Sequence, residues 1–350
     1  MADEIPPNPD YKRIATEEAW GPPEMFQAYE RLLDEGIDDP GFQSLWGFYW
    51  KHPSERASLI RERLQDLGER RLHDMKVSGV DHAVLGLTAP GVQIFQKDEA
   101  VELARLSNDV LAEACKAHPD KYTGMAAVAP QDPKAAADEL ERAVKTLGMK
   151  ACVINSHTHD EYLSDQKFWP ILEACETLDV PLYLHPQGPS RGLIAPLVKA
   201  GLDGAVFGFG VETGFHALSM ITSGVFDRFP KLQLILGHMG EALPFWLYRL
   251  DYMHAAGIRS KRYPHMPELK KKVSDYMREN VIVTSSGMPA EAPIRYSQEV
   301  LGEDRVMYAM DYPYQYLPEE VTMQDNMSIG AAAKKKFFQT NAERVFKIRV

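Results

Sequence analysis

Residues 180–186 read Val-Pro-Leu-Tyr-Leu-His-Pro, a short apolar run that ends in a histidine followed by a proline. Continuous apolar runs of this length are typical of strands that are buried on both faces, as in parallel sheets. A proline directly after the run disfavours further regular pairing. The run therefore predicts a buried strand at 180–184 that places His185 at its C-terminal end.

Further runs of the same kind are spread along the chain, with helical periodicity between them. Strands are predicted at 11–16, 83–87, 122–128, 150–154, 180–184, 232–236, 281–284 and 306–309, and helices at 58–78, 97–117, 133–147, 166–178 and 267–279. This alternation favours an α/β fold, namely a (β/α)₈ TIM barrel. A doubly wound open sheet is the alternative, but no glycine-rich phosphate-binding motif follows the first predicted strand.

The 350 residues are predicted to form a single domain, because no repeat or low-complexity linker divides them. Two connections are too long for plain barrel loops. Residues 21–56 carry an aromatic run at 46–50, and residues 186–231 carry an apolar helix at about 211–226. Long ordered excursions after strands commonly form the rim of an active site or a subunit contact. Residues 1–10 are acidic and proline-rich, and we expect a flexible arm there.

The composition argues against several classes of function. The net charge of −11 disfavours nucleic acid or an anionic membrane as partner, since both are bound mainly through lysine and arginine. The three cysteines form no CxxC pair, which fits a reducing cytoplasm better than a disulfide framework. The N-terminus lacks the features of a signal peptide, and no apolar stretch is long enough to span a bilayer. We therefore expect a cytoplasmic protein that binds a small molecule.

Polar residues at the C-terminal ends of the strands are the candidates for chemistry, because barrel active sites gather there. Glu17 and Glu18 follow the first predicted strand, His185 the fifth, His238 the sixth and Asp311 the eighth. The carboxylates of Glu17 and Asp311 and the imidazole of His185 form a candidate site for a divalent metal ion. Such an oxygen-rich set favours Mn²⁺, Fe²⁺ or Mg²⁺ over Zn²⁺.

Other polar residues have more than one interpretation. Glu241 follows His238 by three residues and either accepts a hydrogen bond from the imidazole or only caps a helix. Arg56, beside the aromatic run, suits the capture of a substrate carboxylate, but a salt bridge at a helix start fits equally well. His157 and His159 are expected to be loop residues and not ligands.

Longer motifs connect these residues to a known family. They read Ile-Ala-Thr-Glu-Glu-Ala at 14–19, Ser-Leu-Trp-Gly-Phe-Tyr at 44–49, Pro-Ser-Glu-Arg-Ala at 53–57, Val-Ala-Pro-Gln-Asp-Pro at 128–133, Phe-Gly-Phe-Gly-Val-Glu-Thr-Gly at 207–214, Gly-His-Met-Gly-Glu-Ala-Leu-Pro at 237–244 and Asp-Arg-Val-Met-Tyr-Ala-Met-Asp-Tyr-Pro-Tyr-Gln-Tyr at 304–316. In this order the motifs resemble the metal-dependent decarboxylase branch of the amidohydrolase superfamily, over nearly the whole chain.

The resemblance implies an amidohydrolase-type TIM barrel and the non-oxidative decarboxylation of a phenolic aromatic acid. The expected substrate is 5-carboxyvanillate, which would give vanillate and CO₂ in the breakdown of aromatic compounds such as those from lignin. The resemblance implies Mn²⁺, with Zn²⁺ or another divalent ion less expected, bound by Glu17, His185 and Asp311. The implied substrate contacts are Arg56, Thr88, Phe209, His238, Tyr314 and Arg249, the last of which is expected to reach a neighbouring subunit of a homodimer or homotetramer.

Ala19 departs from the wider superfamily, in which a histidine follows two residues after the first glutamate. The departure removes a nitrogen ligand and makes zinc-dependent hydrolysis less expected.

In the expected reaction Asp311 gives a proton to the ring carbon that bears the carboxylate, while His238, oriented by Glu241, contacts the substrate. Two alternatives stay open: a metal-dependent hydrolase or hydratase that acts on a lactone or ring-cleavage product, and a non-catalytic barrel that binds a ligand.

Overall fold

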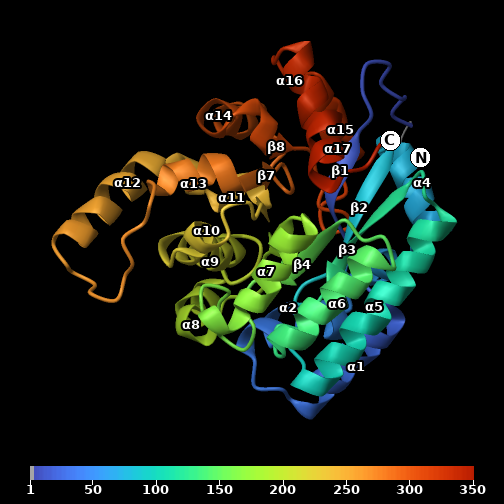
Figure 1. Ribbon diagram of the computed structural model, residues 1–350. Coiled ribbons are helices and arrows are strands. Elements are labelled where there is room, and N and C mark those ends of the chain that lie inside the picture. The colour runs from blue at the N-terminus through green and yellow to red at the C-terminus, as the bar shows by residue number, and fades with distance from the viewer. Residues whose placement is uncertain (1–3) are drawn as a thin grey trace.

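The computed structural model describes residues 4–350, which form an eight-stranded parallel sheet curved into a barrel (Figure 1). The strands are neighbours in chain order, and each pairs in parallel with the next. They are β1 (Ile14–Trp20), β2 (His82–Leu87), β3 (Tyr122–Ala127), β4 (Ala151–Asn155), β5 (Leu182–His185), β6 (Leu234–Leu236), β7 (Val281–Thr284) and β8 (Val306–Met307). This arrangement confirms the predicted (β/α)₈ barrel.

Backbone hydrogen bonds between β1 and the segment that begins with β8 close the barrel. Thr16 N–H donates to Tyr308 O at 3.1 Å, and Ala19 N–H donates to Tyr312 O at 2.7 Å. The strands are buried almost throughout, because helices cover their outer faces and side chains fill the interior. Closure brings the end of β8 beside β1, although the two lie at opposite ends of the chain.

Helices between and after the strands form the outer layer. They are α3 (Glu55–Gln65), α4 (Glu69–Ser78), α5 (Lys97–Ala117), α6 (Pro133–Lys145), α7 (Trp169–Leu178), α13 (Val273–Asn280), α14 (Glu291–Leu301), α15 (Pro318–Asp325), α16 (Ala331–Lys335) and α17 (Asn341–Phe346), with short turns η1 (Gln166–Phe168), η2 (Glu303–Arg305) and η3 (Lys336–Thr340). The predicted helix at 58–78 is instead two helices. Asp66 divides them, because its Oδ1 accepts the N–H groups of Gly68 and Arg71 at 2.9 and 3.2 Å.

The first strand also differs from its prediction. It runs to Trp20 and therefore contains Glu17 and Glu18, which were expected to follow it. Both glutamates are buried, and β1 continues to pair with β2 beyond a register shift between Ala15 and Glu18. The polar pair resembles a strand end in the sequence, but specific partners in the fold keep both carboxylates inside.

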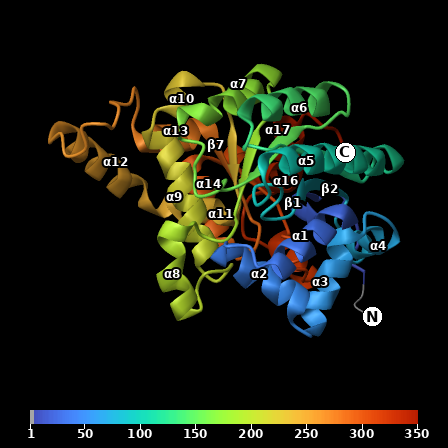
Figure 2. The same ribbon diagram turned by 90° about the horizontal axis from the view of Figure 1, so that it is seen from below.

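The two long excursions lie side by side and form one rim of the barrel (Figure 2). The first contains α1 (Pro23–Glu35) and α2 (Pro40–Lys51), and the second contains α8 (Arg191–Ala200), α9 (Gly208–Thr222) and α10 (Val225–Arg228). Gly41 of α2 meets Gly188 so closely that a Cβ on Gly188 would lie 2.8 Å from Gly41 Cα. Only glycines permit this approach, which draws the two excursions together.

The helix after β6 extends away from the barrel body (Figure 1). A short turn, α11 (His238–Glu241), leads into α12 (Leu243–Arg259). At the other end of the chain, Ile5 N–H donates to Val77 O at 3.0 Å, while residues 1–3 of the predicted arm lie outside the described residues. Within residues 4–350, no helix has both the length and the apolar character needed to cross a bilayer.

Candidate metal centre and active-site pocket

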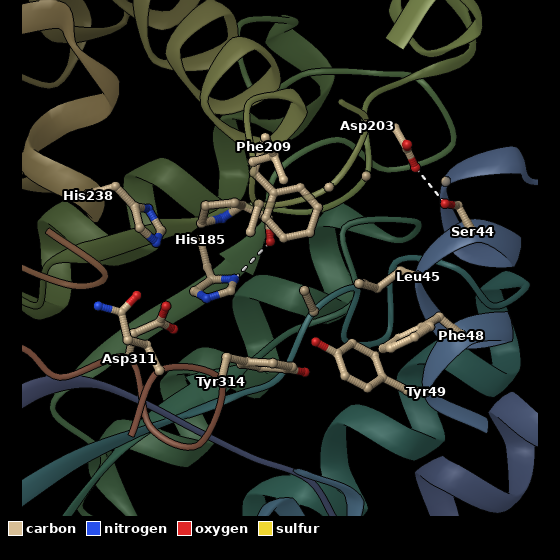
Figure 3. A pocket seen from close by; sticks show the side chains of 18 of the residues that line it. Ser44, Leu45, Phe48, Tyr49, His185, Asp203, Phe209, His238, Asp311 and Tyr314 are labelled. Carbon is tan, nitrogen blue, oxygen red and sulfur yellow. Dashed lines mark hydrogen bonds between the residues drawn. The ribbon is translucent and has the colours of Figure 1, made fainter. Parts of the chain in front are cut away.

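A pocket of about 680 Å³ opens at the C-terminal ends of the strands, where the two excursions meet (Figure 3). Its deep end carries three ionisable side chains, those of His185, His238 and Asp311. The remaining lining is largely apolar and aromatic and includes Leu45, Phe48, Tyr49, Val206, Phe209 and Tyr314. A cavity of this size and character suits a small aromatic ligand with charged substituents.

The side chains at the deep end lie close enough to share one metal ion. One ligand atom from each of Glu17, His238 and Asp311 lies within 4.8 Å of those of the other two. His185 is a neighbour of this group, because its Nε2 lies 3.4 Å from Glu17 Oε1, against 3.8 Å for the Nε2 of His238. The structure thus groups Glu17 and Asp311 most closely with His238, and places the predicted ligand His185 beside Glu17.

Glu17 has one oxygen engaged and one without a partner. Its Oε2 accepts hydrogen bonds from the hydroxyls of Tyr183 and Thr284, the latter at 3.0 Å. Its Oε1 is buried without a hydrogen-bond partner among the described residues, on the side of His185 and His238. A buried carboxylate oxygen in this state is costly unless a cation binds it. Together with the mixed oxygen and nitrogen donors, this fits a divalent ion such as Mn²⁺.

His185 has the tautomer and the charge of a metal ligand. Its Nδ1 lies 2.8 Å from the carbonyl oxygen of Pro186, so Nδ1 carries the proton and Nε2 offers its lone pair (Figure 3). Burial lowers the pKa of His185, which keeps the imidazole neutral at neutral pH. The neutral imidazole is the form that binds metal ions.

His238 differs from His185 in its charge. Glu241 Oε1 lies 2.8 Å from His238 Nδ1, which confirms the predicted hydrogen bond between them. Burial by itself would lower the pKa of His238, but the negative charges of Glu241 and Glu17 raise it to about 10. The imidazole is therefore a cation at neutral pH, which suits an anionic substrate better than a metal ion.

The backbone that follows His238 is a tight turn and not the expected helix start. Met239 and Gly240 have φ values of 57° and 72°, in the left-handed region. A Cβ at Gly240 would lie 2.8 Å from Cγ1 of Val283, so glycine is required there. The turn brings Glu241 back to the imidazole, and the interpretation of Glu241 as only a helix-capping acid is therefore wrong.

Asp311 combines partial burial with an unusual backbone. Burial raises the pKa of Asp311 to about 8; His238 opposes the rise, whereas Glu17 and Glu241 add to it. Its φ is 71°, a conformation that residues other than glycine adopt rarely and often at functional sites. A carboxyl group that holds its proton near neutral pH is suited to general acid catalysis.

The predicted substrate contacts lie in or behind the lining of the pocket. Arg56, Phe209 and Tyr314 line it, and Thr88 lies behind Tyr314, with 2.6 Å between their hydroxyl oxygens. Arg56 Nη2 donates to the carbonyl oxygen of Tyr314 at 2.7 Å. Among the described residues, Arg56 is the one arginine or lysine that lines the pocket, and it has no ion pair within 4.0 Å. The alternative of a salt bridge at the helix start is therefore not what the structure contains.

Arg249, His157 and His159 lie outside this pocket. Arg249 is exposed on α12 and does not line the pocket of its own chain. The Nε2 atoms of His157 and His159 contact the backbone oxygens of Gly188 and Phe95 at 3.1 and 3.0 Å, as expected for loop histidines.

Sequence reasoning missed the residues that hold Glu17 in place. Tyr183 precedes His185 by two residues and so shares its face of β5, while Thr284 ends β7. Polar residues on the inward face of predicted strands were the available signal. Their target is nevertheless not visible in the sequence, because Tyr183 and Thr284 lie 166 and 267 residues from Glu17.

Comparison with known proteins identifies the family. The protein family described as Amidohydrolase matches residues 48–348. Gamma-resorcylate decarboxylase from Polaromonas sp. JS666 is 38% identical over 305 residues, which cover 85% of this chain and 92% of that protein. The structure of 5-carboxyvanillate decarboxylase from Novosphingobium aromaticivorans, complexed with manganese and 4-hydroxy-3-methoxy-5-nitrobenzoic acid, is 54% identical over 99% of both chains, with a TM-score of 0.97. A dihydroxybenzoic acid decarboxylase from Polaromonas sp. JS666, with bound manganese and 2-nitroresorcinol, is 35% identical over 96% of this chain and 97% of that one, with a TM-score of 0.84. The chain therefore belongs to the amidohydrolase family, which confirms the resemblance of its motifs.

Proposed function

We propose that the chain is a Mn²⁺-dependent decarboxylase of a phenolic aromatic acid and converts 5-carboxyvanillate to vanillate and CO₂. One observation carries the proposal: the unpartnered Oε1 of Glu17 lies beside the protonatable carboxyl of Asp311 at the deep end of an aromatic pocket. The relatives support it, since they are named decarboxylases and two of their structures hold manganese with a nitro-substituted aromatic compound.

Glu17, His185 and Asp311 would hold the ion, through Oε1 of Glu17, Nε2 of His185 and a carboxylate oxygen of Asp311. When bound, the ion would neutralise and orient a phenolate and the carboxylate next to it. His238 would stay outside this set, because the negative charges of Glu241 and Glu17 raise its pKa to about 10 and keep its imidazole protonated. From there it would donate a hydrogen bond to the anionic substrate.

The side chain of Asp311 would carry out the proton transfer. Its carboxyl gives a proton to the ring carbon that bears the leaving carboxylate, which interrupts the aromatic ring at that carbon. The bond from this carbon to the carboxylate then breaks, CO₂ leaves, and the electron pair of that bond restores the aromatic ring. Asp311 is left ionised and regains a proton from water, so the reaction needs no oxidant or reductant.

The rest of the pocket would select the substrate. 5-Carboxyvanillate carries a second carboxylate, which the reaction retains, and Arg56 is placed to bind it as the arginine of the lining. Phe209 and Tyr49 offer ring faces to the aromatic substrate, and Thr88 fixes Tyr314 from behind. We also propose one catalytic domain over residues 1–350, working in the cytoplasm, in keeping with three unpaired cysteines.

A substrate panel tests the function. Protein loaded with Mn²⁺ is expected to release CO₂ from 5-carboxyvanillate, more slowly from 2,6-dihydroxybenzoate, and to leave a lactone unchanged. Chelation of the ion should abolish the release and added Mn²⁺ should restore it. Evolved CO₂ and the ultraviolet spectrum of the ring are the measurements. Hydration or ring opening without CO₂ would support the hydrolase or hydratase alternative, and no reaction with any phenolic acid would overturn the proposal.

We further propose that two copies associate through α12 and that Arg249 reaches the pocket of the partner. Large apolar side chains stand exposed on this helix, with Phe245 at 74% and Tyr248 at 84%, and Trp246, Tyr252 and Met253 are exposed beside them. A patch of this kind is unusual on a free surface and typical of an interface. Arg249 lies on the same helix, which extends from the barrel body (Figure 1).

Mixing two inactive variants tests this arrangement. Arg249→Ala and Asp311→Asn are each expected to be inactive alone, and their mixture is expected to regain activity after the subunits exchange. In a mixed dimer, one pocket has its own Asp311 and an intact Arg249 from the other copy. Measured CO₂ release, with subunit exchange followed by native mass spectrometry, decides the result. Exchange without regained activity, or a monomer in solution, would show that Arg249 does not act on a neighbouring pocket.

A further inference from the structure

Glu18 carries a buried carboxyl group that the chemistry described above does not use. It is the neighbour of Glu17 in β1, but Glu17 contacts the inside of the barrel whereas Glu18 contacts the segment after β8. Its side chain is 4% exposed and does not line the active-site pocket. The cavity beside it measures about 10 Å³, which leaves no room for a ligand larger than one water molecule. The carboxylate therefore serves a partner within the chain.

That partner is the backbone on either side of Asp311. Met310 N–H donates to Glu18 Oε1 at 3.0 Å, and Tyr312 N–H donates to Glu18 Oε2 at 3.2 Å. In an extended strand, N–H groups two residues apart are separated by roughly 7 Å, which is farther than the two oxygens of one carboxylate can span. The chain can make both bonds because it turns at Asp311, whose φ is 71°.

Tyr312, the residue after Asp311, is also held by side chains of α4. The ring of Tyr312 lies under the guanidinium of Arg71, 4.6 Å from its centre, and its hydroxyl donates to Asp74 Oδ2 at 2.9 Å. Arg71 in turn donates to the carbonyl oxygen of Ala19 at 2.7 Å. These contacts fix where Tyr312 lies, and Gln315 N–H donates to Asp311 O at 2.9 Å. Among the described residues, however, only Glu18 accepts from the backbone N–H groups on both sides of Asp311.

We propose that Glu18 is a positioning residue: it fixes the backbone turn at Asp311 and thereby aims the Asp311 carboxyl at Glu17 and His238. Left-handed backbone at a residue with a side chain is unfavourable, so it needs such bonds to persist. The inference rests on the proposed function in taking Asp311 as a metal ligand and proton donor. Loss of a group that orients a metal ligand through hydrogen bonds typically lowers metal affinity or activity by about 10- to 100-fold.

Glu18→Gln is the direct test. Glutamine keeps the size and one acceptor oxygen, but its amide nitrogen faces a backbone N–H and cannot accept its proton. We expect Mn²⁺ binding to the apoprotein to weaken by about 10- to 100-fold. Amide hydrogen exchange of peptides covering 308–314 should accelerate, while exchange in β4 and α6 stays unchanged. Calorimetry with Mn²⁺ alone and exchange read by mass spectrometry measure both without an activity assay.

Glu139→Gln is the matched control. Glu139 is also a largely buried glutamate, which accepts hydrogen bonds from Asn108 and Arg142 at 2.8 Å, but it lies on α6 and does not line the pocket. The variant Glu139→Gln should lower the melting temperature of the protein and leave its Mn²⁺ affinity unchanged. Glu18→Asp, which keeps the carboxyl group on a shorter side chain, provides a second variant in case glutamine disrupts folding, and it should shift both readouts in the same direction.

Wild-type Mn²⁺ affinity and wild-type exchange at 308–314 in a folded Glu18 variant would overturn the inference. An equal loss of Mn²⁺ affinity in Glu139→Gln would overturn it as well, because the effect would then be one of general stability. Failure of the proposed function looks different. The wild-type protein would bind Mn²⁺ but release no CO₂ from any phenolic acid, and the Glu18 variants would still show their local change.

Discussion

Asp311→Asn is expected to bind substrate but to release no measurable CO₂. The amide has nearly the size of the carboxyl group but carries no proton that it can transfer to the ring carbon. General acid groups typically contribute about 10²- to 10⁴-fold to a rate, and the loss of an anionic oxygen beside Glu17 adds to this effect. Single-turnover CO₂ release at saturating Mn²⁺ measures the loss. Titration with 4-hydroxy-3-methoxy-5-nitrobenzoic acid measures whether the pocket still binds an aromatic acid.

A second aspartate in the same C-terminal region provides the control. Asp304 is exposed, pairs with Lys336 at 3.1 Å and does not line the pocket. Asp304→Asn makes the same chemical change and should leave turnover unchanged. Retained turnover in Asp311→Asn would remove Asp311 from the role of acid, whatever its part in binding the ion.

The two histidines at the deep end are expected to respond oppositely to substitution. His185→Asn should lose Mn²⁺ affinity by more than about 100-fold, since removing even an orienting partner of a ligand costs about 10- to 100-fold. His238→Asn should keep Mn²⁺ but lose turnover, because the cation that contacts the substrate is gone. Calorimetry with Mn²⁺ and CO₂ release, applied to both variants, separate the two roles.

This expectation gives the charge of each histidine more weight than the distances between the ligand atoms. The most compact group of ligand atoms contains His238 and not His185. Both histidines have Nδ1 in a hydrogen bond, but the pKa of His238 is raised to about 10, which keeps it positively charged, whereas burial lowers the pKa of His185 and leaves it neutral. A metal ion binds the neutral form, so we assign the ligand role to His185. Loss of Mn²⁺ in His238→Asn, with full affinity in His185→Asn, would reverse the assignment.

The sequence predicted the positions of the strands better than their limits. The strand predicted at 281–284 has the observed bounds of β7, and the run at 180–184 became β5, which ends at His185. The first strand was predicted too early, because Glu17 and Glu18 look like surface residues when neither partner is known. Burial of a carboxylate depends on groups that reach it from elsewhere in the fold, so a local pattern underestimates it.

The candidate site was likewise predictable from the sequence only in part. Residue type and strand order were sufficient to single out Glu17, His185 and Asp311, because parallel strands in a barrel present their C-terminal ends around one opening. The bond between His238 and Glu241 was one of two interpretations that the sequence allowed, since the two residues are only three positions apart. The helix expected at that point begins later, at Leu243, because a left-handed turn in which Gly240 packs against Val283 comes first.

By itself, then, the sequence determined the barrel, the family and the three candidate ligands, because each depends on local periodicity, on the order of strands or on unbroken motifs. The tertiary structure alone decided which oxygen of Glu17 is free, which histidine carries a charge and what holds Asp311 in its turn. Those properties depend on groups such as Tyr183, Thr284 and Glu18, which are 166 to 294 residues away from the atoms they contact. Hydrogen bonds and pKa values are set by what lies within a few ångströms, and only the folded chain brings such distant residues together.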